Sequence, residues 1–149
     1  MADRRDVLFV VLDSMRLDRV SAYGYERETT PALDRLATGA TRYTRAYTAA
    51  PWTLPSHCSM FTGLFPTEHG VTNGFGDATP RLPDSVTTLT ERLAEDGYRT
   101  AGFSNNPWVG QLSGLDRGFD EFVEDRCRVG GSDRRRPRRQ RARRRPRRG

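Results

Sequence analysis

One stretch decides the expected fold, Ala50-Pro51-Trp52-Thr53-Leu54-Pro55-Ser56-His57-Cys58-Ser59-Met60-Phe61-Thr62-Gly63. Pro55 is favoured in the first turn of a helix and Gly63 at the end of one, so the stretch predicts a loop that turns into a helix. Thr53 is then expected just before the helix, where backbone N–H groups favour an anion. Its hydroxyl could attack an ester of a tetrahedral oxyanion if a base or a metal activates it, and the alternative is that Thr53 is only a helix cap.

An apolar run comes directly before Asp13, and it reads Val7-Leu8-Phe9-Val10-Val11-Leu12. A run that is apolar on both faces is typical of an interior strand of a parallel sheet covered by helices. Asp13 would close this strand at its carboxyl end, the edge at which open α/β sheets bind ligands. Its carboxylate is a candidate metal ligand, and the alternative is that Asp13 and Ser14 only form a turn.

The chain up to residue 125 alternates predicted helices with predicted strands. Thr30-Pro31 is a helix start with Gly39 as its stop, and Ser85 is the expected cap of a helix that ends at Gly97. The other expected elements are strands at 41–47 and 98–103, a turn-rich connector at 64–71, a loop at 72–84 and a short edge element or turn at 118–122. Helices between strands favour βαβ units and a parallel sheet.

The charge of the chain is concentrated at its C-terminal end. Residues 126–149 hold 13 of the 25 basic residues and one acidic residue, so residues 1–125 carry 12 basic against 18 acidic groups. Such an Arg-rich tail is expected to be disordered, and it also resembles out-of-frame translation of GC-rich DNA. Without aromatic side chains, any binding of nucleic acid by the tail would be electrostatic, non-specific and salt-sensitive.

Cysteines and hydropathy limit the other function classes. Cys58 and Cys127 form neither a disulfide framework nor a metal-binding spacing, and Cys58 is expected to be a small buried residue of the predicted helix. No apolar run is long enough for a membrane span and no signal peptide is recognised. The expected compartment is therefore the cytoplasm.

Together these motifs resemble, in family order, the N-terminal part of the sulfatase family within the alkaline-phosphatase-like superfamily. The matching segments are 10–19, Tyr23-Gly24-Tyr25, 30–36, 39–43, Thr53-Leu54-Pro55-Ser56, Thr62-Gly63, His69-Gly70, 93–100 and 117–120. The resemblance covers residues 6 to about 125 and implies an α/β fold, a parallel or mixed sheet flanked by helices. It also implies a metal-dependent hydrolase or transferase acting on sulfate or phosphate esters.

The resemblance assigns roles to five residues. Asp13 would bind a divalent metal, which could be Ca, Mg, Mn or Zn, and Thr53 would be the nucleophile and a second ligand. His57, at the place of the family's Arg, would contact a non-bridging oxygen of the substrate, and Asn105 or Asn106 would bind the substrate oxyanion. Because Thr53 stands where the family has Cys or Ser, no formylglycine is expected, and a plain hydroxyl suits phosphoester chemistry.

The family's remaining metal ligands lie far downstream of this region. We therefore expect residues 1–125 to be an incomplete sulfatase-like domain, inactive by itself, followed by the tail at 126–149. The expected substrate is a small-molecule, glycan or lipid ester. The alternative is a non-catalytic protein that binds nucleic acid through its Arg-rich tail. Such binding would not depend on Thr53, and its affinity would fall in high salt.

Overall fold

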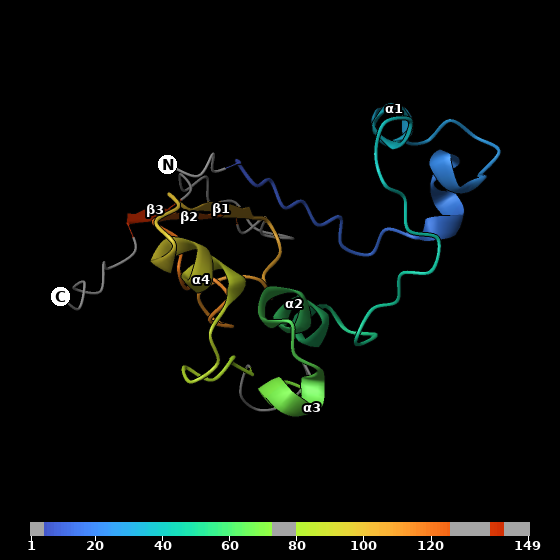
Figure 1. Ribbon diagram of the computed structural model, residues 1–149. Coiled ribbons are helices and arrows are strands. Elements are labelled where there is room, and N and C mark those ends of the chain that lie inside the picture. Colours follow the sequence, from blue (N-terminus) through green and yellow to red (C-terminus); the bar gives the residue numbers. More distant parts are fainter. Residues whose placement is uncertain (1–4, 73–79, 126–137, 142–149) are drawn as a thin grey trace, which may run out of the picture. The chain divides into compact units, whose positions relative to one another are not determined.

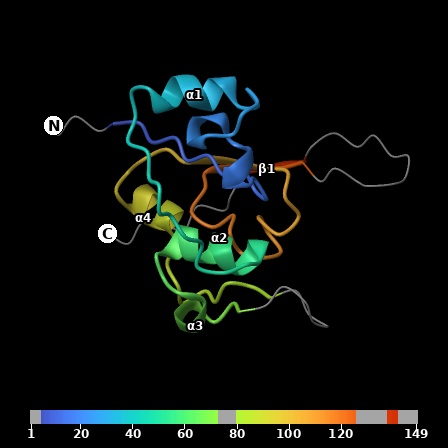
Figure 2. The same ribbon diagram turned by 90° about the vertical axis from the view of Figure 1, so that its right-hand side faces the viewer.

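The computed structural model describes residues 5–72, 80–125 and 138–141, the last of these as backbone only. The chain divides into two compact units, Met1–Tyr47 and Thr48–Gly149. Figures 1 and 2 show the helices and strands of each unit. Among the described residues, no helix has the length and apolar character that a bilayer crossing needs.

The first unit is built from short helices. These are η1 at Leu17–Arg19, η2 at Ser21–Tyr23 and α1 at Pro31–Ala37. The predicted helix start at Thr30-Pro31 is confirmed, although the Thr30 side chain does not cap the backbone. Its hydroxyl instead bonds Ser21 and Asp34, with Thr30 Oγ1 2.9 Å from Ser21 Oγ. These polar contacts tie η2 to α1.

Two strands predicted in the first unit are wrong. Residues 7–12 and 41–47 form no strand, and most of their side chains are exposed, with Leu8 at 89%. A strand needs a neighbouring strand to satisfy its backbone N–H and C=O groups, and the strand pairs of the described residues include neither run. Apolar β-branched composition thus indicates that a segment suits a sheet, without supplying the partner.

The second unit contains the remaining helices and the sheet. Its helices are α2 at Thr53–Thr62, α3 at Pro66–His69 and α4 at Leu89–Glu95. Its strands are β1 at Ala101–Ser104, β2 at Glu121–Glu124 and β3 at Arg138–Arg141, in the spatial order β1-β2-β3. The chain is therefore α/β, as expected, with the sheet confined to this unit.

Helix α2 agrees with its predicted ends to within two residues. Its N-cap is Trp52 and its first residue is Thr53, so Thr53 lies inside the helix and is not its cap. Pro55 falls in the first turn, as predicted. At the other end Gly63 takes φ 72°, and its N–H donates to the Ser59 carbonyl oxygen at 2.8 Å. The glycine stop is confirmed, because only glycine adopts this left-handed conformation without strain.

Helix α4 starts later than predicted. The cap is Thr88 and not Ser85, because Thr88 Oγ1 accepts the N–H of Glu91 at 3.1 Å while the Glu91 carboxylate accepts the N–H of Thr88 at 2.9 Å. This reciprocal pair is a capping box, which satisfies two backbone donors at once. The spacing Thr-x-x-Glu was present in the sequence and outweighs the Ser85 signal.

Strands β1 and β2 are parallel, so a parallel pair is present as expected, but it joins 101–104 to 121–124 and includes neither of the strands predicted in the first unit. Ala101 pairs with Glu121 and Ser104 with Glu124, so both strands start three residues later than the predicted segments 98–103 and 118–122. Their connection, 105–120, consists of turns and contains no helix, so the expected βαβ wiring does not apply to this pair. Arg117 holds the connection in place by donating to the Val86 carbonyl oxygen at 2.7 Å and the Gly114 carbonyl oxygen at 3.1 Å.

Strand β3 pairs with β2 in antiparallel register, Glu121 opposite Arg141 and Glu124 opposite Arg138. It falls within the tail that was predicted to be disordered. The rest of that tail, 126–137 and 142–149, lies outside the described residues, as do residues 73–79 of the predicted 72–84 loop.

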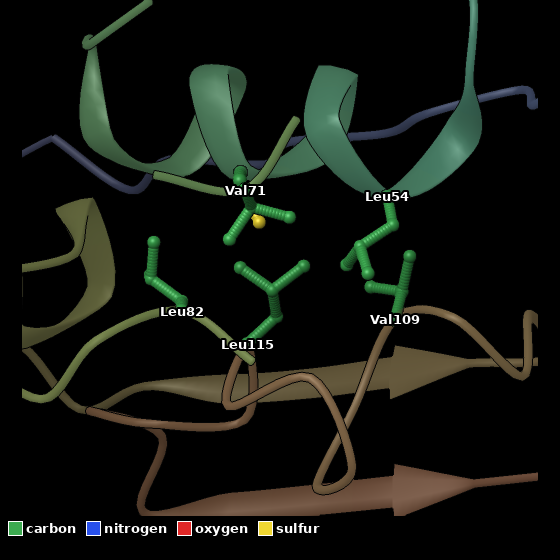
Figure 3. Close-up of a cluster of buried hydrophobic side chains, with 6 residues drawn as sticks. Leu54, Val71, Leu82, Val109 and Leu115 are labelled. Atoms are coloured by element: carbon green, nitrogen blue, oxygen red, sulfur yellow. The ribbon is translucent and has the colours of Figure 1, made fainter. Parts of the chain in front are cut away.

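The core of the second unit lies between α2 and the connection that follows β1. Figure 3 shows its apolar side chains pointing toward one another there. Cys58 belongs to this core and is fully buried, as predicted, and burial raises the pKa of its thiol to about 11. The buried members of the cluster are Leu54, Cys58, Val71, Leu82, Val109 and Leu115.

Candidate functional site

Thr53 lies half-buried at the start of α2. The next residue, Leu54, is buried in the core beside Val109 (Figure 3), which fixes the first turn of the helix. The side chain of Trp52, the N-cap residue, makes no capping hydrogen bond to the backbone of the first turn. A hydroxyl at the start of a helix is therefore held on a packed element, next to backbone N–H groups that helices leave unused at their N-termini.

His57 lies one turn after Thr53, and the structure brings the two together. Nδ1 of His57 is 2.7 Å from the carbonyl oxygen of Thr53. A carbonyl oxygen only accepts, so Nδ1 carries the proton and donates it. The residue as a whole is 5% exposed, and residues four apart share one face of a helix. His57 is thus a fixed neighbour of Thr53 and not a mobile surface residue.

A hydroxyl pair beside Thr53 was missed by sequence reasoning. Thr48 Oγ1 is 2.6 Å from Ser56 Oγ and 2.8 Å from the carbonyl oxygen of Ala50. Since that carbonyl oxygen can only accept, the Thr48 hydroxyl donates to it and accepts a hydrogen bond from the Ser56 hydroxyl. The pair ties the segment before α2 to its first turn. No spacing rule signals it, because the contact crosses a bend in the chain.

Asn105 and Asn106 follow β1 directly, at the carboxyl end of the strand. Asn105 is exposed, whereas Asn106 is half-buried and its Oδ1 accepts the N–H of Trp108 at 3.0 Å. The same segment continues to Val109, which packs against Leu54 of α2. The structure thus connects the end of β1 to the first turn of α2 by one packed contact, and a substrate contact of either asparagine stays a prediction.

Asp13 lies in a turn of the first unit. The N–H of Met15 donates to the Leu12 carbonyl oxygen at 3.4 Å, and Ser14 takes φ 59°. A non-glycine residue in this left-handed region costs about 1–3 kcal/mol, and such strain is found most often at functional sites. The turn that was one alternative for Asp13 is present. Because Asp13 and Thr53 belong to different units, their meeting around one cation stays a prediction.

His69 and Ser59 form a pair that resembles a catalytic dyad, but the histidine donates the hydrogen bond to the serine instead of accepting it. His69 Nδ1 accepts the N–H of Val71 at 3.1 Å, so its proton lies on Nε2, which is 3.1 Å from Ser59 Oγ. Complete burial lowers the pKa of His69 and keeps it neutral. A ring that already donates to Ser59 cannot take the proton of that serine. His69 is therefore a structural residue of segment 64–71, which was expected to be a connector.

The described residues do not complete a metal site by themselves. No group of three or more His, Cys, Asp or Glu side chains is placed to hold a metal in this part of the chain. The side chains that could each supply one ligand are the Thr53 hydroxyl and the His57 imidazole, whose Nδ1 donates to the Thr53 carbonyl oxygen. Structural and catalytic metal sites usually need four or more donors.

Comparison with known proteins places this arrangement in a family. The Sulfatase family model matches residues 5–134. Bovine arylsulfatase A is 34% identical over 97 residues, which cover 64% of this chain and 19% of that protein. Human N-acetylgalactosamine-6-sulfatase is 31% identical over 140 residues, which cover 86% of this chain and 27% of that protein. The chain thus spans about a fifth to a quarter of these relatives.

Solved structures agree with the sequence relatives. A 2-O GAG sulfatase superimposes with a TM-score of 0.64 at 26% identity, covering 78% of this chain and 24% of the other. A phosphonate monoester hydrolase of Agrobacterium radiobacter superimposes with a TM-score of 0.56 at 25% identity, covering 73% and 23%. With its alkaline-phosphatase-like fold and a family model that matches residues 5–134, this chain belongs to the sulfatase family.

Proposed function

We propose that this chain carries the nucleophile-bearing part of a metal-dependent hydrolase or transferase that acts on sulfate or phosphate esters, with Thr53 as the nucleophile. The observation that supports the proposal is that Thr53 is the first residue of α2, the helix on which the resemblance puts the family's nucleophile. The structural similarity to a phosphonate monoester hydrolase supports a range of substrates that extends beyond sulfate esters.

The residues around Thr53 position its hydroxyl. His57 bonds the Thr53 backbone, and the Thr48–Ser56 hydroxyl pair fixes the segment before the helix. The Thr53 oxygen attacks the sulfur or phosphorus of the ester, and the alcohol of the substrate leaves. Because threonine is not the Cys or Ser from which formylglycine is made, Thr53 acts as a plain hydroxyl.

A divalent metal, when bound, would lower the pKa of the attacking hydroxyl and neutralise charge on the transferred group. Thr53 and, from the first unit, Asp13 are the proposed ligands. Asn105 or Asn106 would donate side-chain N–H groups to the substrate oxyanion from the end of β1. Since the described residues offer few metal donors, we expect no sustained hydrolysis from the chain by itself and at most the transfer of a single group to Thr53.

The experiment is a single-turnover measurement on the purified chain. The chain is incubated with an aryl sulfate, an aryl phosphate or a phosphonate monoester in the presence of Ca²⁺, Mg²⁺, Mn²⁺ or Zn²⁺. Released phenol is measured by absorbance, and the modified residue is identified by mass spectrometry. We expect a metal-dependent adduct on Thr53 that Thr53→Ala abolishes and Thr53→Ser retains.

Thr62→Ala is the matched control, since Thr62 lies at the other end of the same helix, where its hydroxyl donates to the Cys58 carbonyl oxygen and accepts the Leu64 N–H. This variant should form the adduct as the unchanged chain does. Product release that survives in Thr53→Ala, or the absence of both adduct and product with all four metals, would contradict the proposal.

A further inference from the structure

Two opposite charges hold one peptide unit of the connection between β1 and β2. Oε1 of Glu124, the last residue of β2, accepts the N–H of Gln111 at 2.6 Å. On the other side of the same residue, Arg81 donates to the Gln111 carbonyl oxygen at 2.7 Å. Hydrogen bonds to ionised groups are shorter and stronger than those between neutral groups. Glu124 therefore fixes the middle of segment 105–120 to the end of a strand.

The residue before Gln111 leaves room for the carboxylate. A Cβ added at Gly110 would lie 2.7 Å from Cδ and 3.2 Å from Cγ of Glu124. Gly110 is not among the described glycines with positive φ, so glycine is needed here for space and not for the backbone conformation. The Glu124 side chain thus packs directly on the backbone that it binds.

The segment held by Glu124 reaches Thr53 through one packed contact. Val109 lies against Leu54 in the core, and Leu54 follows Thr53 in the first turn of α2 (Figure 3). Behind this contact the turn is closed, because the N–H of Gly110 donates to Oγ of the buried Ser113 at 3.2 Å. A displacement at one residue of this closed turn is therefore passed to the side chain that supports α2.

We propose that Glu124 is a positioning residue for the helix that carries Thr53. By fixing Gln111 it keeps Val109 against Leu54, and this contact sets the first turn of α2. The expected effect on the reaction of Thr53 rests on the proposed function, whereas the expected effect on the conformation of α2 does not. Nothing in the sequence pattern singles out Glu124, because its contact lies 13 residues away in the chain.

The first test measures the rate of adduct formation on Thr53 in single turnover. Glu124→Ala should lower the rate constant about tenfold or more while the amount of adduct at completion stays the same, because a misplaced nucleophile reacts slowly. A loss of folded protein would instead lower the amount of adduct. Glu124→Gln keeps an oxygen that accepts the Gln111 N–H and should regain most of the rate.

Asp125→Ala is the matched control for these variants. Asp125 is the next carboxylate of the chain and is exposed, and its backbone N–H donates to the Ser104 carbonyl oxygen at 2.8 Å. Removal of its side chain leaves that bond in place and should leave the rate constant unchanged.

Gly110→Ala tests the same contact without touching the carboxylate. The added methyl group takes the place of the Glu124 carboxylate, which must move away from Gln111. We expect this variant to slow adduct formation as much as Glu124→Ala does, and the double variant to be no slower than either single one. Losses that multiply in the double variant would contradict one shared contact. If Glu124→Ala does not fold, Gly110→Ala decides by the same readouts.

Methyl spectra of the ¹³C-labelled chain, without ester or metal, measure the conformation of α2 directly. In Glu124→Ala we expect the Thr53 methyl signal to shift and the nuclear Overhauser contact between the Leu54 and Val109 methyl groups to weaken. The methyl signal of Thr62, at the other end of α2, is the internal control and should stay unchanged. Circular dichroism checks that each variant folds.

Two results would overturn the positioning role. They are a Thr53 methyl signal that a folded Glu124→Ala chain leaves in place, and a Glu124→Gln chain that is as perturbed as Glu124→Ala. The expected shifts in an unchanged chain that forms no adduct would support the positioning role and contradict the proposed function. An adduct on Thr53 whose rate constant is the same in folded Glu124→Ala would do the reverse.

Discussion

The two units of this chain use apolar residues in opposite ways. In the second unit, Leu54, Leu82 and Leu115 are fully buried between α2 and the connection after β1. In the first unit, Val20 is the only buried apolar residue among the described ones, and the most apolar run of the chain, residues 7–12, is exposed. Hydrophobic sequence therefore becomes a core only where another element supplies the opposing face.

The first unit is held together by polar contacts instead. Ser21 Oγ lies 2.6 Å from the Asp34 carboxylate, and Arg42 donates to the Ala22 carbonyl oxygen and lies over the Tyr23 ring. Hydrogen bonds of this kind contribute about 0.5–1.5 kcal/mol each. They organise η2 and α1 without excluding water, so the two units should respond differently to the same substitution.

The largest expected difference comes from one pair of leucine substitutions. Leu115→Ala removes a fully buried side chain from the core of the second unit and should lower the free energy of unfolding by about 2–5 kcal/mol. Leu8→Ala, in a residue that is 89% exposed, should change it by less than about 0.5 kcal/mol. Urea unfolding followed by tryptophan fluorescence measures both, and a similar loss in the two variants would remove the contrast between the units.

Glycine substitutions come next in size. Gly118 has φ 83°, and an added Cβ would lie 2.3 Å from the backbone nitrogen of Glu91. Gly118→Ala should therefore cost about 1–3 kcal/mol or more, because strain and a clash with backbone add together. Gly24 in the first unit has φ 98° but no atom within 4 Å of an added Cβ, so Gly24→Ala should cost only about 1–2 kcal/mol of backbone strain. Equal losses would show that the clash at Gly118 relaxes.

The capping box of α4 gives a smaller effect. Thr88→Ala removes the oxygen that accepts the Glu91 N–H and should destabilise the second unit by about 1 kcal/mol. Thr88→Ser keeps that oxygen and should retain most of the stability. Thermal unfolding of the two variants is the measurement. If serine is as costly as alanine, the methyl group of this buried threonine matters more than the cap.

The reactivity of the Cys58 thiol reports whether water enters the core of the second unit. The raised pKa of this thiol changes the stability little with pH near neutrality. Because burial raises its pKa to about 11, folding holds the proton more tightly, and this contribution is present below pH 9 and is lost as the pH rises toward 11. In a Cys127→Ser background, a thiol reagent at pH 8 should therefore react with Cys58 only after urea unfolds the chain. Fast reaction in the native state would mean that water enters this core.

Local signals in the sequence predicted several elements well. Pro55, Gly63 and the Thr30-Pro31 pair located α2 and α1 to within a few residues, because proline and glycine restrict the backbone wherever the chain folds. Ser85 is a weaker signal than the reciprocal Thr88–Glu91 pair, because a lone serine satisfies one backbone donor and the capping box satisfies two. The strand starts were three residues early, since strand limits depend on the partner strand and not on propensity alone.

The sequence by itself determined the family motif, the places of Thr53 and His57 one helical turn apart, and the helix that carries both, because spacing and backbone preference are local properties. Only the tertiary structure decided which apolar segments form a core, that residues 7–12 form no strand, and which nitrogen of each histidine holds the proton. Those outcomes depend on groups distant in the sequence or on the exact direction of a side chain, which no residue pattern encodes.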